Sequence, residues 1–245
     1  MKKIELLGIK IASILQKEII PIVIIRLQEK NYKKPFYITT PNPEIIVVAQ
    51  KNAELKNAVN ESDLAIPDGV GLVWASRFLG TPLRERVTGI DLMLGLCKEF
   101  AAKKISVGLL GAQDGVAKAA SVNLKKIYPQ LEIAFAQSEI PKEKLKCDFL
   151  FVAYGAPKQE KFIYEQVQKI KNKKNNQVNF KGAMGVGGAF DFLSGRVTRA
   201  PVFIQKLNLE WLWRLIIEPW RWRRIVTATL YFPWLVLLSK INKST

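Results

Sequence analysis

The sequence contains no histidine among its 245 residues. Histidine is the side chain that usually exchanges protons near neutral pH, and it completes most serine and cysteine nucleophile pairs and most zinc sites. Its absence excludes the histidine-dependent form of each of these sites. Any proton transfer in this protein must therefore use Asp, Glu, Tyr or Lys.

Cysteine and paired aspartates are also scarce. Only Cys97 and Cys147 occur, without a C-x-x-C pair, and we predict that both are buried, reduced thiols of a cytosolic protein. No D-x-D pair occurs, although an enzyme that holds a nucleotide diphosphate through a carboxylate-bound metal would be expected to have one. We therefore expect no metal site, and a leaving diphosphate would depend on arginines and helix N-termini.

Long apolar runs are missing as well. The most apolar stretch, Ile225–Leu238, is shorter than the roughly 20 residues that cross a bilayer, and Pro233 interrupts it. At the N-terminus, Glu5 and Lys10 interrupt the apolar residues that follow Lys2 and Lys3, so a secretory signal is not expected. Peripheral attachment to a membrane surface is the interpretation that these lengths favour.

Acidic residues are outnumbered. The chain has 38 Lys and Arg against 21 Asp and Glu, a formal net charge of +17. Such a balance indicates a polyanionic partner, which can be nucleic acid, an anionic membrane or a phosphorylated substrate. The length and the apolar content of 49% are sufficient for one large domain, or for one domain with an appendage.

Strand and helix patterns alternate along most of the chain. Strands are predicted near Ile4–Ile11, at Phe36–Thr39, Leu64–Ile66, Ile105–Leu110, Leu131–Ala136 and Phe149–Ala153, and more weakly before Gly185. Helices are predicted at Ser13–Lys30, with Ser13 as N-cap, and at Pro43–Asn57, Val70–Phe78, Asp91–Ala102, Val116–Tyr128 and Gln159–Lys171, followed by a polar loop at Asn172–Asn176. This alternation predicts an α/β fold, with a mostly parallel, Rossmann-like sheet covered by helices on both faces.

The turn Ile66-Pro67-Asp68-Gly69 joins a predicted strand to a predicted helix. Proline fixes one backbone angle and glycine frees another, so Asp68 is held in a sharp bend. In one interpretation Asp68 caps the helix that follows. In the other it is a functional carboxylate at the carboxyl end of a strand, where open α/β sheets bind their ligands.

Four further turns follow predicted strands, and each contains residues suited to sugar or phosphate. They are Thr39–Asn42, Gly108–Gly115, Tyr154–Glu160 and Gly185–Gly188. Any one of them can be a simple tight connection. Together, at one edge of a sheet, they favour a ligand that contains a diphosphate. The glycines do not match the G-x-G-x-x-G fingerprint, which argues against a nicotinamide-dependent oxidoreductase.

The composition changes near Arg199. Five of the six tryptophans lie beyond it, and residues 199–245 contain eight Lys and Arg against Glu210 and Glu218. We predict an α/β core at residues 1–198 and a basic, Trp-rich appendage at residues 199–245. A helix predicted over Ile204–Glu218 would carry Lys206, Glu210, Arg214 and Glu218 as one polar stripe of i,i+4 pairs. Such a helix can pack into the core or lie at a membrane surface.

Several motifs, in order and at suitable spacing, resemble the WecG/TagA/CpsF glycosyltransferase family over roughly residues 4–225. They are Thr40-Pro41-Asn42, Pro67-Asp68-Gly69, Glu85-Arg86-Val87-x-Gly89, Gly155-x-Pro157-Lys158-Gln159-Glu160, Gly185-x-Gly187-Gly188-x-Phe190-Asp191, Arg199-Ala200-Pro201, Leu209-Glu210-Trp211-Leu212-x-Arg214-Leu215 and Glu218-Pro219-x-Arg221.

The resemblance implies an inverting, metal-independent transfer of an N-acetylhexosamine-type sugar from a UDP-sugar. The implied acceptor is an undecaprenyl-diphosphate-linked sugar at the cytoplasmic face of the membrane. In the teichoic-acid members the donor is UDP-N-acetylmannosamine and the acceptor carries N-acetylglucosamine. Other members transfer N-acetylmannosaminuronate or build capsule and exopolysaccharide, so the transferred sugar stays open.

The resemblance also implies residue roles. Asp68 is the expected general base, with Thr40 and Asn42 beside it in the pocket. The residues expected to bind the donor, its diphosphate or the acceptor are Arg86, Gly111, Gly155, Gln159, Gly187, Gly188, Asp191, Arg214, Arg221 and Arg224. The last three belong to the appendage, which is expected to close over the site at an anionic membrane surface.

Two stretches depart from the family pattern. The segment between Ala136 and Phe149 is shorter than usual and lacks a Gly-Tyr-Phe-like sequence, and the tail beyond Arg224 is more apolar. A homo-oligomer is compatible with the sequence. The competing interpretation, a basic nucleic-acid-binding protein, depends on net charge and interleaved Trp and Arg residues, and no nucleic-acid motif accompanies them.

Overall fold

A computed structural model of the chain describes residues 2–29, 33–140, 144–174 and 178–242. Its strands are β1 (Lys3–Leu6), β2 (Ile9–Ala12), β3 (Phe36–Thr39), β4 (Leu64–Ala65), β5 (Val107–Gly111), β6 (Ile133–Gln137), β7 (Leu145–Lys146), β8 (Phe149–Ala153), β9 (Val178–Asn179) and β10 (Gly182–Gly185).

The helices of the first two thirds of the chain alternate with these strands. They are α1 (Gln16–Gln28), α2 (Pro43–Ala49), α3 (Ala53–Asn60), α4 (Val70–Phe78), α5 (Gly89–Lys103), α6 (Val116–Ile127), α7 (Lys158–Lys171) and α8 (Ala189–Leu193). The C-terminal elements are α9 (Val202–Lys206), α10 (Glu210–Ile217), the 3-10 turn η1 (Pro219–Arg221), α11 (Trp222–Val226), the π-helical turn η2 (Thr227–Tyr231) and α12 (Phe232–Ile241).

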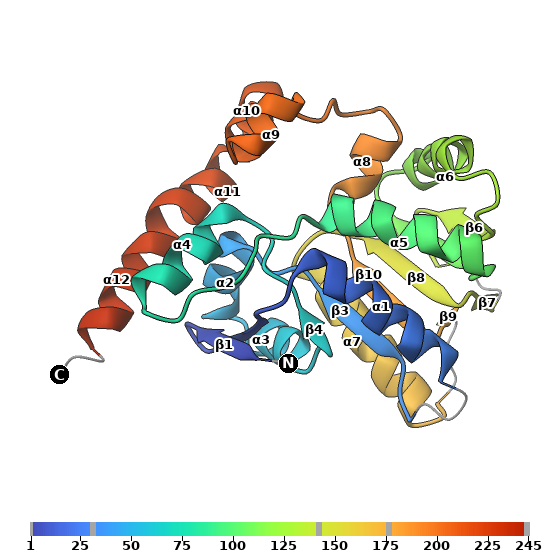
Figure 1. The fold of residues 1–245 in the computed structure, drawn as a ribbon, viewed down its shortest axis with the longest axis horizontal. Helices are drawn as coiled ribbons and strands as arrows, with labels where there is room; N and C mark the ends of the chain where they lie inside the picture. The colour runs from blue at the N-terminus through green and yellow to red at the C-terminus, as the bar shows by residue number, and fades with distance from the viewer. Residues whose placement is uncertain (1, 30–32, 141–143, 175–177, 243–245) are drawn as a thin grey trace.

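The main sheet has six parallel strands in the order β4-β3-β10-β8-β5-β6. Its two faces are covered separately (Figure 1). Apolar residues of α1, α5 and α6 pack on one face against Ile38, Leu109 and Phe151, whereas α7 packs on the other face against Leu150 and Val152. The predicted α/β class, with a parallel sheet between two helical layers, is confirmed.

The N-terminal stretch differs from the single strand predicted over Ile4–Ile11. It folds into an antiparallel hairpin, β1 and β2, because Leu7 and Gly8 both adopt positive φ angles, 51° and 76°, as a two-residue hairpin turn requires. The helix that follows begins after Leu15 and not after Ser13. The Glu18 carboxylate accepts a hydrogen bond from the backbone N–H of Leu15. The residue predicted as its last, Lys30, lies outside the described residues.

Other boundaries shift for local reasons. The helix predicted over Pro43–Asn57 is two helices, because Asn52 caps α3 by accepting the Leu55 N–H at 3.0 Å. In the polar loop predicted at Asn172–Asn176, the last two residues lie outside the described ranges. The shortened segment before Phe149 contains β7, and its residues 141–143 are likewise outside the description.

The helix predicted over Ile204–Glu218 is also divided. It breaks between α9 and α10, because Asn208 has a φ of 61°, a left-handed conformation that ends a helix. Arg214 and Glu218 form one of the expected i,i+4 pairs, but Glu210 pairs elsewhere. The prediction of one continuous polar stripe along this segment is therefore wrong.

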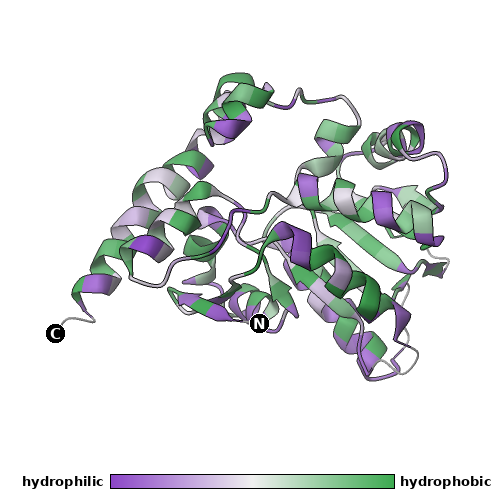
Figure 2. Ribbon diagram, viewed as in Figure 1, coloured by the Kyte–Doolittle hydropathy of each residue, from purple (hydrophilic) through white to green (hydrophobic). Residues whose placement is uncertain are grey.

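The C-terminal helical run lies beside α2 and α4 (Figure 1). Phe232 and Val236 of α12 are completely buried with Ile45, Ile46 and Leu72. From Pro219 to Ile241 the run is 23 residues long, which by length and composition alone is enough to cross a membrane. The predicted apolar stretch Ile225–Leu238 is therefore part of a longer helical run. Figure 2 shows hydrophobic residues along these outer helices as well as on the central strands.

Candidate active site

A cavity of about 860 Å³ opens at the carboxyl edge of the sheet. The turns after the four neighbouring strands β4, β3, β10 and β8 form its floor, and α10, α11 and η2 form its outer wall. Most of the residues that the sequence singled out line it: Thr40, Asn42, Asp68, Arg86, Gly155, Gln159, Gly187, Gly188, Asp191, Arg214, Arg221 and Arg224. The fold thus brings twelve separate positions to one site.

Gly111 is the exception, together with the whole Gly108–Gly115 turn, which does not line the cavity. Gly108–Gly111 are the last four residues of β5, so the turn itself begins after Gly111. β5 lies beyond β8, one strand further from the cavity. Gly111 has a φ of 108°, and a Cβ there would lie 2.9 Å from the backbone of Ala153. Its glycine is thus explained by the close approach of two strands, and the binding role expected for it is not supported.

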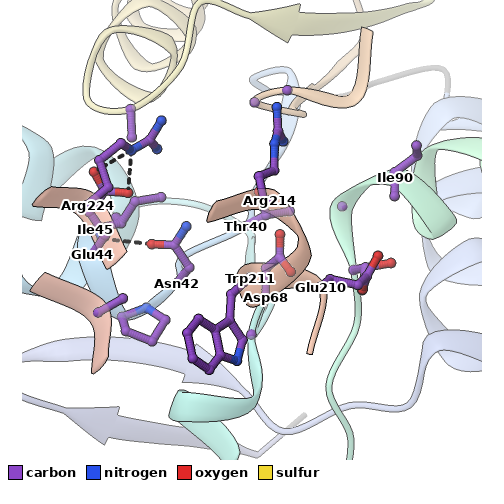
Figure 3. A pocket seen from close by; sticks show the side chains of 18 of the residues that line it. Thr40, Asn42, Glu44, Ile45, Asp68, Ile90, Glu210, Trp211, Arg214 and Arg224 are labelled. Carbon is purple, nitrogen blue, oxygen red and sulfur yellow. Dashed lines mark hydrogen bonds and ion pairs between the residues drawn. The ribbon is translucent and has the colours of Figure 1, made fainter. Parts of the chain in front are cut away.

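Asp68 does not cap the helix that follows it. Gly69, with a φ of 115°, is the N-cap of α4, and no side chain accepts a hydrogen bond from the first turn. The backbone N–H of Asp68 donates to the Pro41 carbonyl at 2.9 Å, which holds the turn against the end of β3. The carboxyl group instead accepts a hydrogen bond from the backbone N–H of Gly89, the first residue of α5. The capping interpretation is wrong, and the side chain faces the cavity (Figure 3).

The surroundings of Asp68 raise the pKa of its carboxyl group from 3.8 to about 6. Burial is the main cause, and the negative charges of Glu210 and Asp91 add to it. The positive charge of Arg86 and the Gly89 N–H oppose the rise. A carboxylate with this pKa is ionised at neutral pH but is more basic than an ordinary aspartate, as a general base requires.

Thr40 and Asn42 fix the turn next to Asp68. The Thr40 hydroxyl donates to the Gly185 carbonyl at 3.1 Å, which joins the ends of β3 and β10. The Asn42 side chain caps α2 by accepting the Ile45 N–H at 2.9 Å, so only its amide NH₂ is left for a ligand (Figure 3). Both residues hold the floor of the site in shape.

Gln159 joins two glycine turns. Its carbonyl oxygen accepts the Gly155 N–H at 3.2 Å and the Gly187 N–H at 3.0 Å. Its amide donates to Glu160 at 2.8 Å, and burial raises the pKa of that carboxyl group. Gly185 has no room for a Cβ, which would lie 2.9 Å from the Gln159 amide nitrogen. Gln159 is therefore a brace for the two turns.

Arginines gather on the side of the cavity formed by the appendage, and each has a carboxylate partner. Arg224 pairs with Glu44 at 2.8 Å (Figure 3). Arg221 pairs with Glu218 at 3.0 Å, and Arg214 pairs with Glu218 and, at 3.9 Å, with Asp191.

Arg221 lies close to the other positive charges of this group. Burial, together with the positive charges of Arg214 and Arg224, lowers its pKa. The positive charges of this cluster thus lie close enough to act on one another, although carboxylates partner each of them.

Gly188 and Phe192 shape the space around Arg214. A Cβ on Gly188 would lie 2.8 Å from Nη1 of Arg214, and the guanidinium group stacks over the Phe192 ring at 4.5 Å. Arg214 is thus held in one position by packing, and Gly188 is needed for it to reach the cavity.

Glu210 is the residue that sequence reasoning interpreted wrongly, since it was placed on a polar stripe. Its carboxylate pairs with Arg86 at 2.8 Å and with Arg199 at 3.3 Å. The only signal in the sequence was its place in the Leu209-Glu210-Trp211 motif.

Within residues 2–29, 33–140, 144–174 and 178–242, no three His, Cys, Asp or Glu residues come together as metal ligands would.

An open parallel sheet with an arginine-containing pocket at its carboxyl edge and one carboxyl group of raised pKa in that pocket is typical of enzymes that act on phosphorylated ligands. Comparison with known proteins makes the assignment specific. The chain belongs to the glycosyl transferase WecG/TagA/CpsF family, whose model matches residues 4–245. It is therefore a glycosyltransferase.

Several relatives carry the name N-acetylglucosaminyldiphosphoundecaprenol N-acetyl-beta-D-mannosaminyltransferase. The relative from Bacillus subtilis (strain 168) is 36% identical over 231 residues, which cover 89% of this chain and 86% of the relative. The relative from Bacillus spizizenii is 35% identical, covering 82% and 79%. The relative from Staphylococcus aureus (strain MRSA252) is 35% identical, covering 77% and 74%.

Proposed function

We propose that this enzyme transfers N-acetylmannosamine from its UDP derivative to N-acetylglucosamine carried on undecaprenyl diphosphate. The names of the relatives support this donor and acceptor. Another UDP-sugar, such as an N-acetylmannosaminuronate or glucose type used for capsule or exopolysaccharide, is the alternative outcome of the same chemistry.

The observation that carries the proposal is the pairing, in one cavity, of Asp68 with an arginine cluster. Asp68, with a pKa of about 6, accepts the proton of the acceptor hydroxyl as that oxygen attacks the anomeric carbon. The bond to the UDP oxygen breaks, and its electrons leave with the diphosphate. Because attack and departure take place on opposite faces of the sugar ring, the configuration of the anomeric carbon inverts.

The departing diphosphate requires positive charge. Arg214, Arg221 and Arg224 supply it from the appendage, and Arg86 supplies it from the core. Guanidinium groups bind phosphate oxygens through paired N–H donors, so they can stabilise the leaving group in place of a metal ion. The reaction is accordingly proposed as metal-independent.

The proposed location is the cytoplasmic face of the membrane, with peripheral attachment through the appendage. Trp220, Leu230 and Trp234 are 71%, 67% and 55% exposed, although they are large and apolar. Such residues suit the interfacial layer of a bilayer, where basic side chains meet lipid phosphates. Because Phe232 and Val236 of the same helical run are buried against the core, a spanning orientation would carry α2 and α4 into the lipid.

The experiment is a transfer assay with the full-length chain. A short-chain polyprenyl-diphosphate N-acetylglucosamine acceptor is incubated with a panel of UDP-sugars, with and without EDTA, and products are detected by mass. We expect one added N-acetylhexosamine from UDP-N-acetylmannosamine, insensitive to EDTA and lost in Asp68→Asn. Absence of transfer from every UDP-sugar, or full activity of Asp68→Asn, would contradict the proposal.

A further inference from the structure

An ionic network joins the appendage to the loop beside Asp68. Arg199, the first residue of the appendage, donates to both oxygens of Asp91 at 2.7 and 2.8 Å. Its Nε lies 3.3 Å from Glu210, whose other oxygen is 2.8 Å from Nη2 of Arg86. Glu210 thus lies between one arginine of the core and one of the appendage.

The same network surrounds Asp68. The charged groups that act on the Asp68 carboxyl from the elements packed around it are Arg86 before α5, Asp91 on α5 and Glu210 on α10. Arg199 is paired with both of those acids, and Asp191 and Arg214 line the cavity beyond them. Of the three charged groups that act on Asp68, Glu210 is the one that belongs to the appendage.

Arg86 faces two carboxylates with different tasks. If it paired with Asp68 alone, its positive charge would stabilise the ionised form and weaken Asp68 as a base. Glu210 forms a direct ion pair with the Arg86 guanidinium group. The Arg86 side chain is only 19% exposed and the Glu210 side chain 23%. At this exposure water screens the two charges less than it would at the surface, and the charge of Glu210 also acts on the Asp68 carboxyl group.

We propose that Glu210 is a positioning residue that the appendage contributes to the reaction: it holds Arg86 beside Asp68 and supplies the negative charge that keeps Asp68 able to accept a proton. The inference rests on the proposed function for the role of Asp68. It makes appendage docking a condition for an effective base, in addition to bringing Arg214, Arg221 and Arg224 to the diphosphate.

The test is the Glu210→Gln variant, which keeps the shape of the side chain and removes its charge. The acidic limb of its kcat/KM profile, recorded from pH 4.5 to 9, should shift to lower pH by roughly half a unit to one unit. Its plateau should fall, because Asp68 is then a weaker base. Its Kd for UDP should fall roughly two- to fivefold, because one negative charge has left an anion site.

A merely structural role predicts a different pattern. If Glu210 only anchors the appendage, kcat/KM falls equally at every pH and UDP binds more weakly. Glu44→Gln is the matched control, since it breaks another ion pair between core and appendage, with Arg224, and Glu44 is not among the groups that act on Asp68. The acidic limb of the Glu44→Gln profile should stay at the wild-type pH. The acidic limb of the Glu210→Asp profile should stay close to the wild-type pH as well, because this variant keeps the negative charge.

One further measurement does not depend on turnover. The Asp68 carboxyl carbon, assigned by its loss in Asp68→Asn, is titrated by NMR in the wild type and in Glu210→Gln. A lower midpoint in the variant supports the inference, and an unchanged midpoint overturns it. A wild type that transfers no sugar contradicts the proposed function instead, so the two failures are distinguishable. If Glu210→Gln does not fold, Arg86→Gln is measured instead. Removing the positive charge that Glu210 holds beside Asp68 should move the acidic limb to higher pH, and an unshifted limb overturns the inference.

Discussion

At the scale of single residues, Asp68, the proposed general base, lies where its negative charge reduces the stability of the folded protein. Burial beside Glu210 and Asp91 disfavours its charge and raises its pKa to about 6. An ordinary aspartate would be ionised from pH 4 upward in both the folded and unfolded states. Here the folded state holds its proton up to higher pH, so ionising Asp68 costs folding energy.

The Asp68→Asn variant should therefore be inactive but more stable. Below pH 4 the aspartate is protonated in both states and the variant should match the wild type. The wild type loses stability relative to the variant as the pH rises from about 4 to 6, and above that the gain should be about 1–2 kcal/mol, or a few degrees in Tm, since the side chain keeps some contact with water. Thermal unfolding recorded at pH 4 and pH 7.5 measures the difference.

Activity supplies the other half of this prediction. Transfer by Asp68→Asn should fall by roughly 10²- to 10⁴-fold at its best pH. Asp114→Asn is the control, because Asp114 is exposed and lies outside the cavity, and both its Tm and its activity should match the wild type. Equal stability of Asp68→Asn and wild type at pH 7.5 would contradict the account of Asp68 given above.

At the scale of elements, the helical run from Pro219 to Ile241 has two faces with separate tasks. One face places Phe232 and Val236 in the apolar cluster around Leu72. The other face exposes Trp220 and Trp234. Packing of the first face positions Arg221 and Arg224 at the cavity, and the second face is the one proposed to contact a membrane.

Substitutions on the two faces should therefore give opposite results. Phe232→Ala removes a completely buried ring and should cost about 3–5 kcal/mol of local stability, so that residues 219–241 exchange amide hydrogens faster and transfer is lost. Trp234→Ala should change the stability by no more than about 0.5 kcal/mol and should weaken binding to vesicles. Hydrogen exchange and vesicle sedimentation on both variants separate these effects.

The reverse result would contradict this division. If Trp234→Ala loosened residues 219–241 as much as Phe232→Ala, the exposed face would be part of the folded core. If Trp234→Ala bound vesicles as the wild type does, the exposed aromatic residues would not contact lipid.

At the scale of the whole molecule, two forces are expected to bring the protein to a membrane. The net charge of +17 attracts it to anionic lipid over a distance that salt shortens. The exposed apolar residues of the appendage act only at contact and depend little on salt.

Binding to vesicles that contain anionic lipid should therefore fall in two stages. Between 50 mM and 500 mM salt it should weaken by about tenfold or more, and a residual, salt-resistant fraction should remain. Vesicles of neutral lipid should show only that residual fraction. Sedimentation at a series of salt concentrations measures both. Binding that is equal for neutral and anionic lipid would show that charge plays no part.

Much of the fold follows from local patterns in the sequence. The strands at Phe36–Thr39 and Phe149–Ala153 and the helix at Val70–Phe78 lie where apolar periodicity predicts them. The errors arise where a single residue ends or restarts an element: Leu7 and Asn208 through a positive φ, and Asn52 as the N-cap of α3. The left-handed conformation of Leu7 is rare for a leucine. The pairing of β1 with β2 stabilises it, together with a hydrogen bond that the Gln50 side chain donates to the Leu7 carbonyl.

The site shows the same division. Polar turns after strands were sufficient to predict a site at the carboxyl edge of a parallel sheet, because the carboxyl ends of such strands share one edge. Strand order is not a local property, so the sequence could not tell that the β5 turn with Gly111 lies one strand too far away. Nor could the sequence show that the side-chain oxygen of Gln159 accepts hydrogen bonds from two backbone N–H groups.

The sequence by itself determined the kind of chemistry that this protein can perform. Without histidine and without paired aspartates, proton transfer falls to a carboxylate and charge stabilisation to arginines. Only the tertiary structure decided which carboxylate is basic enough. The pKa of Asp68 depends on burial and on Glu210, which is distant in the sequence, and charges affect one another through space rather than along the chain.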